Sequence, residues 1–382
     1  MPLRNRRGFL SCILGSAWAG ASLLERASLR AADARARSWQ APATLFDLEK
    51  VADGVYGAVA RGRALINSNS VIFDTVDGLL IVDSQASPSA VAALVAQIRR
   101  EIGAKPVRYV VVTHLHGDHT QGLAEHRRLA PDVRMISSSS TLERLQATGT
   151  TRLKSAVDGA RQSLETFTGR ASTAKTADER AYWQEMAAQT RAFIAETVNL
   201  QVELPDVKVD DRLVIHDPAG EIHVFFQGRG HTAGDLFVHC PQKRVIATGD
   251  MFHSFFPSMG DSYPGEWQAT LREISKLPFD TAIGGHGGLQ RAPVRLRSWR
   301  AYLDELCARV TRAREQGMPL ERLVETVAPA TLRSLRANRY GDFLLGQMRR
   351  YDFRIRMNTQ AEVAARYVRE NLTAVFRNLG RN

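Results

Sequence analysis

Cysteine is scarce in this chain of 382 residues: there are three, Cys12, Cys240 and Cys307. So few cysteines cannot build the disulfide framework that stabilises small secreted domains. Cys240 and Cys307 lie within apolar patterns, so we interpret both as core residues rather than as metal ligands or a disulfide pair. Disulfide chemistry is therefore excluded as the basis of the fold.

The sequence also lacks an internal repeat, and its only low-complexity tract is the run of serines at 137–140. Its formal net charge is +11, which suits anionic substrates or surfaces. However, no Lys/Arg cluster is interleaved with aromatic residues, so we predict no nucleic-acid partner. The apolar and charged fractions, 44% and 24%, are those of an ordinary soluble globular protein.

A long hydrophobic run is also missing at the N-terminus. The apolar stretch Phe9–Leu24 is short and interrupted by Ser and Gly, so it would span a bilayer poorly. It follows the pair Arg6–Arg7 and precedes small Ala-x-Ala sites, the layout of a twin-arginine export signal. We predict a signal over residues 1–36, a periplasmic mature protein and no stable membrane association after cleavage. The alternative is an uncleaved amphipathic helix or membrane anchor.

Residues 45–290 are predicted to form an α/β catalytic domain. Short branched apolar segments separated by turn residues predict strands, and residues 88–103 and 266–277 show apolar positions at helical spacing. The predicted strands cover 55–60, 70–74, 79–83, 107–114, 212–216, 221–227, 235–240, 244–250 and 281–286. The strand–helix–strand order from 79 to 114 predicts a layered α/β arrangement.

Two stretches are instead helical in pattern. Residues 141–199 are rich in Ala, Glu, Gln and Arg, and an amphipathic stripe predicts helices. We interpret this stretch as a helical insertion lying over the β-core. From 293 to 382 the chain is again helical and Arg-rich, a C-terminal extension in which the sequence shows no site. The sequence does not predict an oligomeric state.

The chemistry concentrates in VVVTHLHGDHTQG, residues 110–122, where three histidines and an aspartate follow a valine run. In an extended segment alternate residues share a face, so His114 and His116 can point at one ion. A turn at Gly117 then directs Asp118 and His119 toward a second position. Imidazole and carboxylate suit Zn²⁺, with Fe and Mn as alternatives. The cluster predicts half of a metal site.

Further candidate ligands follow three later strands. Each apolar strand runs into a small turn that presents one residue, and these residues are His231 in GRGHTAGD, Asp250 in TGD and His286 in GGHG. Strand ends that meet at one edge of the sheets can bring such residues together. The pattern therefore predicts a complete metal centre.

In this order, THLHGDH, GHTAGD, TGD and GGHG resemble the metallo-β-lactamase superfamily over roughly residues 45–290. The resemblance implies the αββα metallo-β-lactamase sandwich, here with the helical insertion and helical extension. It also implies two Zn²⁺ ions, the first held by His114, His116 and His231. Asp118, His119 and His286 would hold the second ion, and Asp250 would bridge both ions. Asp83 would bind neither ion but would orient the site through contact with a ligand.

This resemblance implies a metal-dependent hydrolase of a small-molecule substrate. Two zinc ions share a water and make hydroxide available at neutral pH, and the hydroxide attacks a carbonyl or similar electrophile. Asp118 would hold the nucleophile and carry a proton. We expect an ester, thioester, lactone or lactam as the substrate.

Three alternatives stay open. An antibiotic-degrading β-lactamase is disfavoured because those enzymes place Cys or Ser where Asp250 stands. A mononuclear-iron oxidoreductase of the same fold, such as a persulfide dioxygenase, needs fewer ligands than this chain offers. A non-catalytic binding protein would not need every ligand. Alkylsulfatases of the superfamily use a Glu ligand and a lipid-carrier-like tail, and we place neither here.

Substrate contacts are predicted from loops beside the metals. Arg229, close to His231, could bind a carboxylate, or it could be an outward surface residue. Asn69 lies in a loop that, by the resemblance, flanks the cleft. Tyr263 belongs to an aromatic segment after Asp250 that could form an apolar wall or part of the core.

Overall fold

The computed structural model describes residues 45–61, 68–291 and 293–380. The predicted signal, residues 1–36, lies outside these ranges. Among the helices formed by the described residues, none combines the length and the apolar character that crossing a membrane requires.

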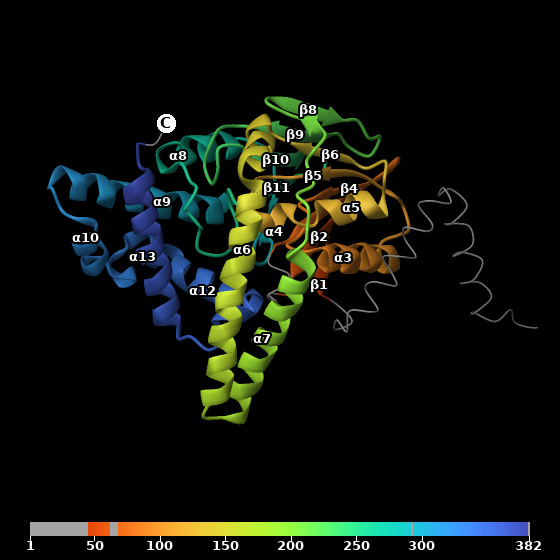
Figure 1. The fold of residues 1–382 in the computed structure, drawn as a ribbon. Helices are drawn as coiled ribbons and strands as arrows, with labels where there is room; N and C mark the ends of the chain where they lie inside the picture. Colours follow the sequence, from red (N-terminus) through yellow and green to blue (C-terminus); the bar gives the residue numbers. More distant parts are fainter. Residues whose placement is uncertain (1–44, 62–67, 292, 381–382) are drawn as a thin grey trace, which may run out of the picture.

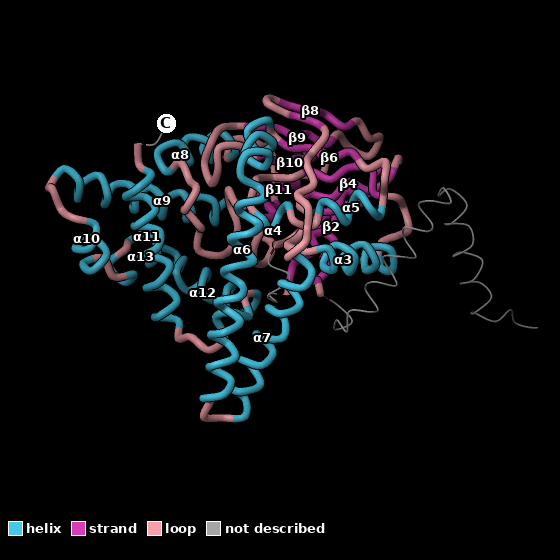
Figure 2. The backbone as a smooth tube through the Cα atoms, in the orientation of Figure 1, coloured by secondary structure: helices cyan, strands magenta, loops and turns pink. Residues whose placement is uncertain are grey.

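Two β-sheets form the centre of the molecule (Figures 1 and 2). The first sheet has seven strands in sequence order, antiparallel from β1 to β4 and parallel from β4 to β7. Its strands are β1 (Phe46–Ala52), β2 (Val55–Ala60), β3 (Ser70–Thr75), β4 (Gly78–Val82), β5 (Val107–Val111), β6 (Arg134–Ser137) and β7 (Val207–Lys208).

The second sheet has six strands in the order β13-β12-β11-β10-β9-β8. Only the β11–β12 pair is parallel. Its strands are β8 (Arg212–Ile215), β9 (Ile222–Phe226), β10 (Leu236–Cys240), β11 (Val245–Gly249), β12 (Thr281–Gly284) and β13 (Gln290–Arg291).

Alternating side chains explain why the two sheets stack. In β4, Leu80 and Val82 belong to the core between the sheets, whereas Leu79 and Ile81 pack with helix α3 (Pro88–Glu101) on the outer face. In β10, Phe237 faces the outer core instead. Successive strand residues point to opposite faces, so each sheet buries both of its faces. This is the predicted αββα sandwich.

The outer face of the second sheet is covered by α8 (Pro264–Ile274) and the C-terminal helices. One continuous apolar core joins Phe237 of the sheet to Trp267 of α8, Trp299 of α9 and Leu372 of α13. The C-terminal helices are α9 (Pro293–Glu315), α10 (Leu320–Thr326), α11 (Arg333–Arg336), α12 (Tyr340–Tyr351) and α13 (Gln360–Asn378). The helical extension therefore shares a core with the sandwich.

A long helical hairpin leaves the body of the molecule (Figure 1). It consists of α6 (Ser139–Thr173) and α7 (Ala177–Thr197). Ser138 caps α6 by accepting a hydrogen bond from Thr141 N, and its hydroxyl donates to Gly234 O. The hairpin thus starts at the turn that also carries His231. The hairpin extends away from the sheets (Figure 1), so the prediction that the insertion lies over the β-core is wrong. The predicted fold class itself is confirmed: an α/β αββα sandwich with a helical insertion and a helical C-terminal region.

The predicted strands agree with the structure to within a few residues, with one consequential exception. Strand β5 ends at Val111, three residues before the predicted end at His114. The sequence prediction also passed over β1, β6, β7 and β13. Of these, β7 and β13 are two residues long, too short for an alternating pattern to be visible.

Candidate metal centre

The first histidines lie beyond strand β5 rather than in it, which corrects the predicted placement. Neighbouring β4 ends at Val82, and the Asp83 carboxylate accepts a hydrogen bond from Thr113 N at 2.8 Å in place of a strand partner. His116 has extended φ/ψ of −69° and 149° and immediately precedes the short helix α4 (Gly117–Thr120). The direction of Asp118 and His119 is therefore set by a helical turn, where we predicted a turn at Gly117.

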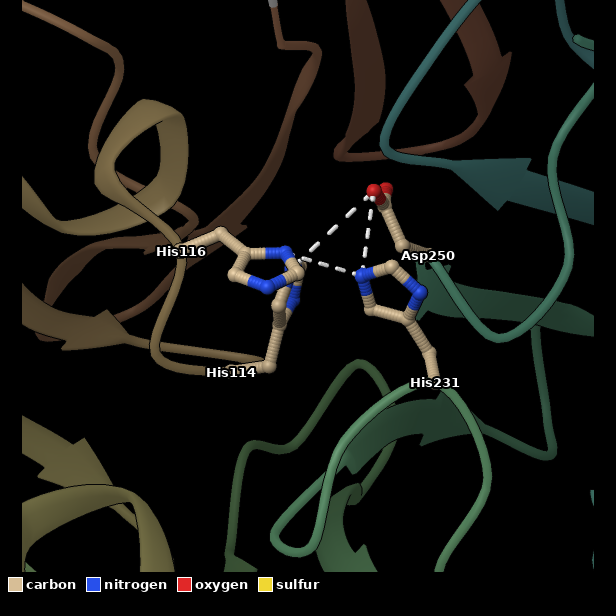
Figure 3. Close-up of side chains that lie close together, drawn as sticks. All are labelled: His114, His116, His231 and Asp250. Carbon is tan, nitrogen blue, oxygen red and sulfur yellow. Dashed lines mark hydrogen bonds and ion pairs between the residues drawn. The ribbon is translucent and has the colours of Figure 1, made fainter. Parts of the chain in front are cut away.

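Four side chains converge in a first group, drawn in Figure 3. His116 Nδ1 lies 3.1 Å from His114 Nε2 and 3.0 Å from His231 Nε2. Asp250 Oδ2 lies 3.6 Å from His231 Nε2 and 4.0 Å from His114 Nε2. The structure thus brings together residues from three separate loops around one point.

A second group consists of Asp118, His119 and His286. Asp118 Oδ2 lies 3.4 Å from His119 Nε2 and 3.3 Å from His286 Nε2. Asp250 reaches this group as well, since its Oδ1 lies 3.6 Å from His119 Nε2 and its Oδ2 lies 3.1 Å from His286 Nε2. The Asp250 carboxylate therefore borders both groups.

Asp83 lies directly behind the second group. Its Oδ2 is 2.8 Å from His119 Nδ1, and the same carboxylate accepts the Thr113 hydroxyl at 3.0 Å. Asp83 has a positive φ of 66°, which is uncommon for a residue with a side chain. This backbone strain is held at the point where the carboxylate meets His119. A partner on Nδ1 leaves His119 Nε2 facing the other ligands.

The donor set fits divalent metal ions. Asp250 Oδ1 and His119 Nε2 are buried and have no hydrogen-bond partner among the described residues, which is costly unless something else satisfies them. Burial lowers the pKa of His114, assisted by the neighbouring imidazoles, and lowers that of His231 to about 3. Neutral imidazoles are the form that binds metal.

The carboxylates are ionised for a different reason. Burial raises the pKa of Asp118, but His119 and His286 outweigh it and hold that pKa below its usual value. Asp250 behaves in the same way, with the same two imidazoles opposing burial. The effect is mutual, because Asp118 and Asp250 raise the pKa of His119 and His286 against the effect of burial. Carboxylate oxygens facing imidazole nitrogens form a pocket that suits a hard or borderline cation.

The turn before His286 requires glycine. A Cβ at Gly285 would lie 2.2 Å from Asp250 Oδ1 and 2.7 Å from His119 Cε1. Asn69 holds the same turn: its Nδ2 donates to Gly284 O and Gly287 O, each at 2.8 Å, and its Oδ1 accepts from Ala60 N. Asn69 is buried and committed to these bonds, so its observed role is to shape the His286 turn; the structure gives no support for the predicted substrate contact.

Arg229 and Tyr263 are likewise engaged within the protein. The Arg229 guanidinium pairs with Glu266 at 2.5 and 2.9 Å and lies 4.4 Å from the centre of the Tyr263 ring. Tyr263 is 7% exposed and directly precedes α8. These contacts favour a structural role for both residues over the predicted substrate binding.

The sequence did not predict the residues that hydrogen-bond to the ligands of the first group. Asp261 Oδ2 accepts from His116 Nε2 at 2.9 Å, and Arg152 Nη2 donates to both Asp261 oxygens at 3.0 and 2.9 Å. His231 Nδ1 lies 2.9 Å from the carbonyl oxygen of Ser258. Hydrogen bonds from His116 and Arg152 lower the pKa of Asp261, against the effect of burial. No sequence motif marks these positions.

Comparison with known proteins agrees with this geometry. The family profile of the metallo-beta-lactamase superfamily matches residues 64–286. The "Metallo-beta-lactamase type 2" of Bacillus cereus is 21% identical over 228 residues, which cover 58% of this chain and 68% of that protein. A protein of the same name from Bacillus sp. (strain 170) is 21% identical over 228 residues, 58% of this chain and 67% of its own.

A solved structure extends the likeness to more of the chain. The stereoselective inverting sec-alkylsulfatase Pisa1 from Pseudomonas sp. has a TM-score of 0.62 at 17% identity, covering 88% of this chain. This chain spans about half of that protein, 51% of its length. At this identity the likeness shows a shared fold.

The profile match covers more than half of the chain, and the two His/Asp groups lie together at one edge of the αββα sandwich. The protein belongs to the metallo-beta-lactamase superfamily and is a metal-dependent hydrolase.

Proposed function

We propose that the protein is an exported dizinc hydrolase that cleaves a small ester, thioester, lactone or lactam. The observation that carries this proposal is the position of Asp250. Its carboxylate lies 3.6 Å from His231, 3.6 Å from His119 and 3.1 Å from His286, so one residue borders both groups, as a shared ligand of two metal ions must. The first ion would be held by His114, His116, His231 and Asp250, and the second by Asp118, His119, His286 and Asp250.

The residues of the site would divide the chemistry between them. Bound zinc would lower the pKa of a water and polarise the carbonyl oxygen of the substrate. Asp118 is partly exposed, at 21% of its side chain, whereas Asp250 is 5% exposed. Asp118 is thus the carboxylate that can reach both the attacking water and the leaving group, and we assign it the transfer of the proton. Ser68 holds the Asp118 backbone by donating its hydroxyl to Asp118 O at 2.5 Å.

Two related functions are less well supported. The curated relatives are named β-lactamases, but an aspartate stands at 250 where we expect Cys or Ser in those enzymes. A mononuclear-iron oxidoreductase needs only the first three histidines and water. Here the second group is complete and backed by Asp83 at 2.8 Å from His119, which favours two metal ions.

The sulfatase neighbour adds one further substrate to test. Its fold covers most of this chain, but among the described residues the two metal-binding groups contain no glutamate, the ligand type we expect in alkylsulfatases. A secondary alkyl sulfate therefore belongs in the substrate panel as a competing hypothesis.

Metal analysis combined with a substrate panel tests the proposal. The mature protein, loaded with zinc, should contain two zinc ions per chain and hydrolyse at least one of an ester, thioester, lactone and lactam. A strong chelator should remove this activity, and added zinc should restore it. His116→Ala, which removes one ligand, serves as the control. One iron ion per chain, or turnover of only the alkyl sulfate, would refute the proposal.

Export can be tested separately from catalysis. Replacing Arg6 and Arg7 by lysine should block translocation, because the paired arginines define the predicted signal. We expect full-length precursor to accumulate in the cytoplasm in place of the processed form, as measured by cell fractionation and mass spectrometry of the N-terminus. Lysine at Arg26 and Arg30, outside the pair, is the matched control. Unchanged processing of the Arg6/Arg7 variant would show that the segment is not a twin-arginine signal.

A further inference from the structure

The loop Ser258–Tyr263, here called the support loop, contacts two ligands of the first group from outside. The carbonyl of Ser258 accepts from His231 Nδ1 at 2.9 Å, and Asp261 accepts from His116 Nε2 at 2.9 Å. A hydrogen bond on one ring nitrogen fixes which nitrogen faces the metal. The support loop therefore determines that His231 presents Nε2 and His116 presents Nδ1.

The support loop is held on one side by the helical hairpin. Arg152, midway along α6, donates to both oxygens of Asp261 at 2.9 and 3.0 Å. Helix α6 is itself anchored beside the site, because Ser138 and Thr141 donate to the carbonyl of Gly234 at 2.7 and 3.2 Å. A rigid helix fixed at its start can place Arg152 accurately.

Apolar packing between α6 and the loop that carries the histidines is incomplete. A cavity of about 30 Å³ lies between them, and its lining includes Leu115, Gly117, Gly149 and Leu153. An unfilled space of this size removes some of the packing contacts between the loop and α6. The hydrogen bonds from Arg152 and from His116 to Asp261 lie in the same region, and they are directional contacts.

On another side the support loop is held by the last helix of the described chain. Asn378, at the end of α13, donates from Nδ2 to Met259 O at 3.2 Å and to Gly260 O at 2.9 Å. Within the loop, Ser262 bonds to Met259 O at 2.7 Å through its hydroxyl. The C-terminal helix thus contacts the same loop as the hairpin.

We propose that the support loop, clamped by Arg152 of α6 and Asn378 of α13, orients His116 and His231 and so determines metal affinity at the first group. The proposal gives the helical insertion and the helical extension a shared task that lies outside the sandwich itself. It rests on the ligand assignment of the proposed function. The residues concerned are positioning residues, since each acts through a ligand.

The experiment measures metal affinity of each group without substrate. Zinc binding is followed by competition with a chromophoric chelator in two backgrounds of the mature protein. His286→Ala isolates the first group, and His114→Ala, which leaves the support loop untouched, isolates the second. Asp261→Asn should raise the zinc Kd of the first group by roughly 10- to 100-fold, as is usual for outer partners of metal-bound histidines.

Arg152→Ala and Asn378→Ala should raise the same Kd by roughly 10-fold, and Arg152→Lys should recover part of the loss, since lysine keeps the charge but not the planar guanidinium. Kd of the second group should stay within about 3-fold of its starting value, because its ligands have other partners. Arg161→Ala is the matched control, because Arg161 lies on the same helix and its ion-pair partner within the described ranges is nearby Asp158, with the Arg161 side chain 54% exposed. Far-UV circular dichroism and the melting temperature of the metal-free variants report the fold.

The outcomes separate this inference from the proposed function. If the His286→Ala protein binds no zinc at the first group, the ligand assignment fails. If it binds zinc normally but Arg152→Ala and Asp261→Asn match Arg161→Ala, the support-loop proposal is wrong. If the Arg152 and Asp261 variants raise the zinc Kd of both groups equally, the support-loop proposal is also overturned, since that result indicates a general loss of structure.

Discussion

Asp250→Ala is expected to abolish metal-dependent hydrolysis, lowering kcat/KM by roughly 10³-fold or more, because metal-activated water is lost. The carboxylate borders both groups, at 3.6 Å from His231 Nε2 and 3.1 Å from His286 Nε2. Under the proposed ligand assignment, its removal would take a ligand from each metal ion at once. We therefore expect the zinc content to fall from two ions to fewer than one per chain, as measured by elemental analysis after gel filtration.

The same substitution at Asp280 provides the control. Asp280 directly precedes β12, the strand that leads to His286, but its side chain is 67% exposed and pairs with Arg244. Asp280→Ala should keep both zinc ions and nearly full activity. An Asp250→Ala protein that retained two zinc ions per chain would show that Asp250 does not bridge the groups.

Trp299→Ala is expected to lower the free energy of unfolding by about 3–5 kcal/mol, the usual cost of removing a large buried aromatic side chain. Trp299 lies on α9 and is fully buried. Its ring centre is 5.7 Å from that of Phe252 and 6.3 Å from that of Trp267. The substitution opens a cavity where the C-terminal helices meet the outer face of the second sheet. Denaturant unfolding followed by circular dichroism measures the loss.

The matched variant is Trp299→Phe, which keeps an aromatic ring at this contact. Trp299 Nε1 has no hydrogen-bond partner among the described residues, so phenylalanine breaks no polar contact and should cost clearly less. Because one apolar core runs from the sheet into the extension, we expect a single unfolding transition for both variants. A separate early transition of the C-terminal helices would contradict a shared core.

Much of the αββα framework could be predicted from local pattern. Strands such as Val55–Ala60 and Val245–Gly249 are short apolar segments ended by turn residues, and strand geometry directs successive side chains to opposite faces of the sheet. The end of β5 could not be predicted in this way, because valine and threonine continue the apolar pattern beyond Val111. Pairing ends there since β4 ends at Val82 and the Asp83 side chain takes the next amide, Thr113 N.

The predicted substrate contacts show that a sequence does not reveal whether a polar side chain is free to bind a substrate. Arg229 and Asn69 have the chemistry to bind a substrate, but whether a polar group is available depends on its neighbours in the fold. Glu266 pairs with Arg229, and the carbonyls of Gly284 and Gly287 accept from Asn69. A buried polar group such as Asn69 is normally committed to partners within the protein, and the partners of both Asn69 and Arg229 are distant in the chain.

The candidate ligands stand out in the sequence because they lie shortly after apolar strands and close to glycines, and imidazole and carboxylate carry a chemistry that few other patterns share. Only the tertiary structure decided how they are oriented. His116 meets Asp261 across 145 positions of the chain, and Arg152 meets Asp261 across 109. Contacts of this length have no sequence period, because they arise where helix α6 and the support loop are packed against the same edge of the sandwich.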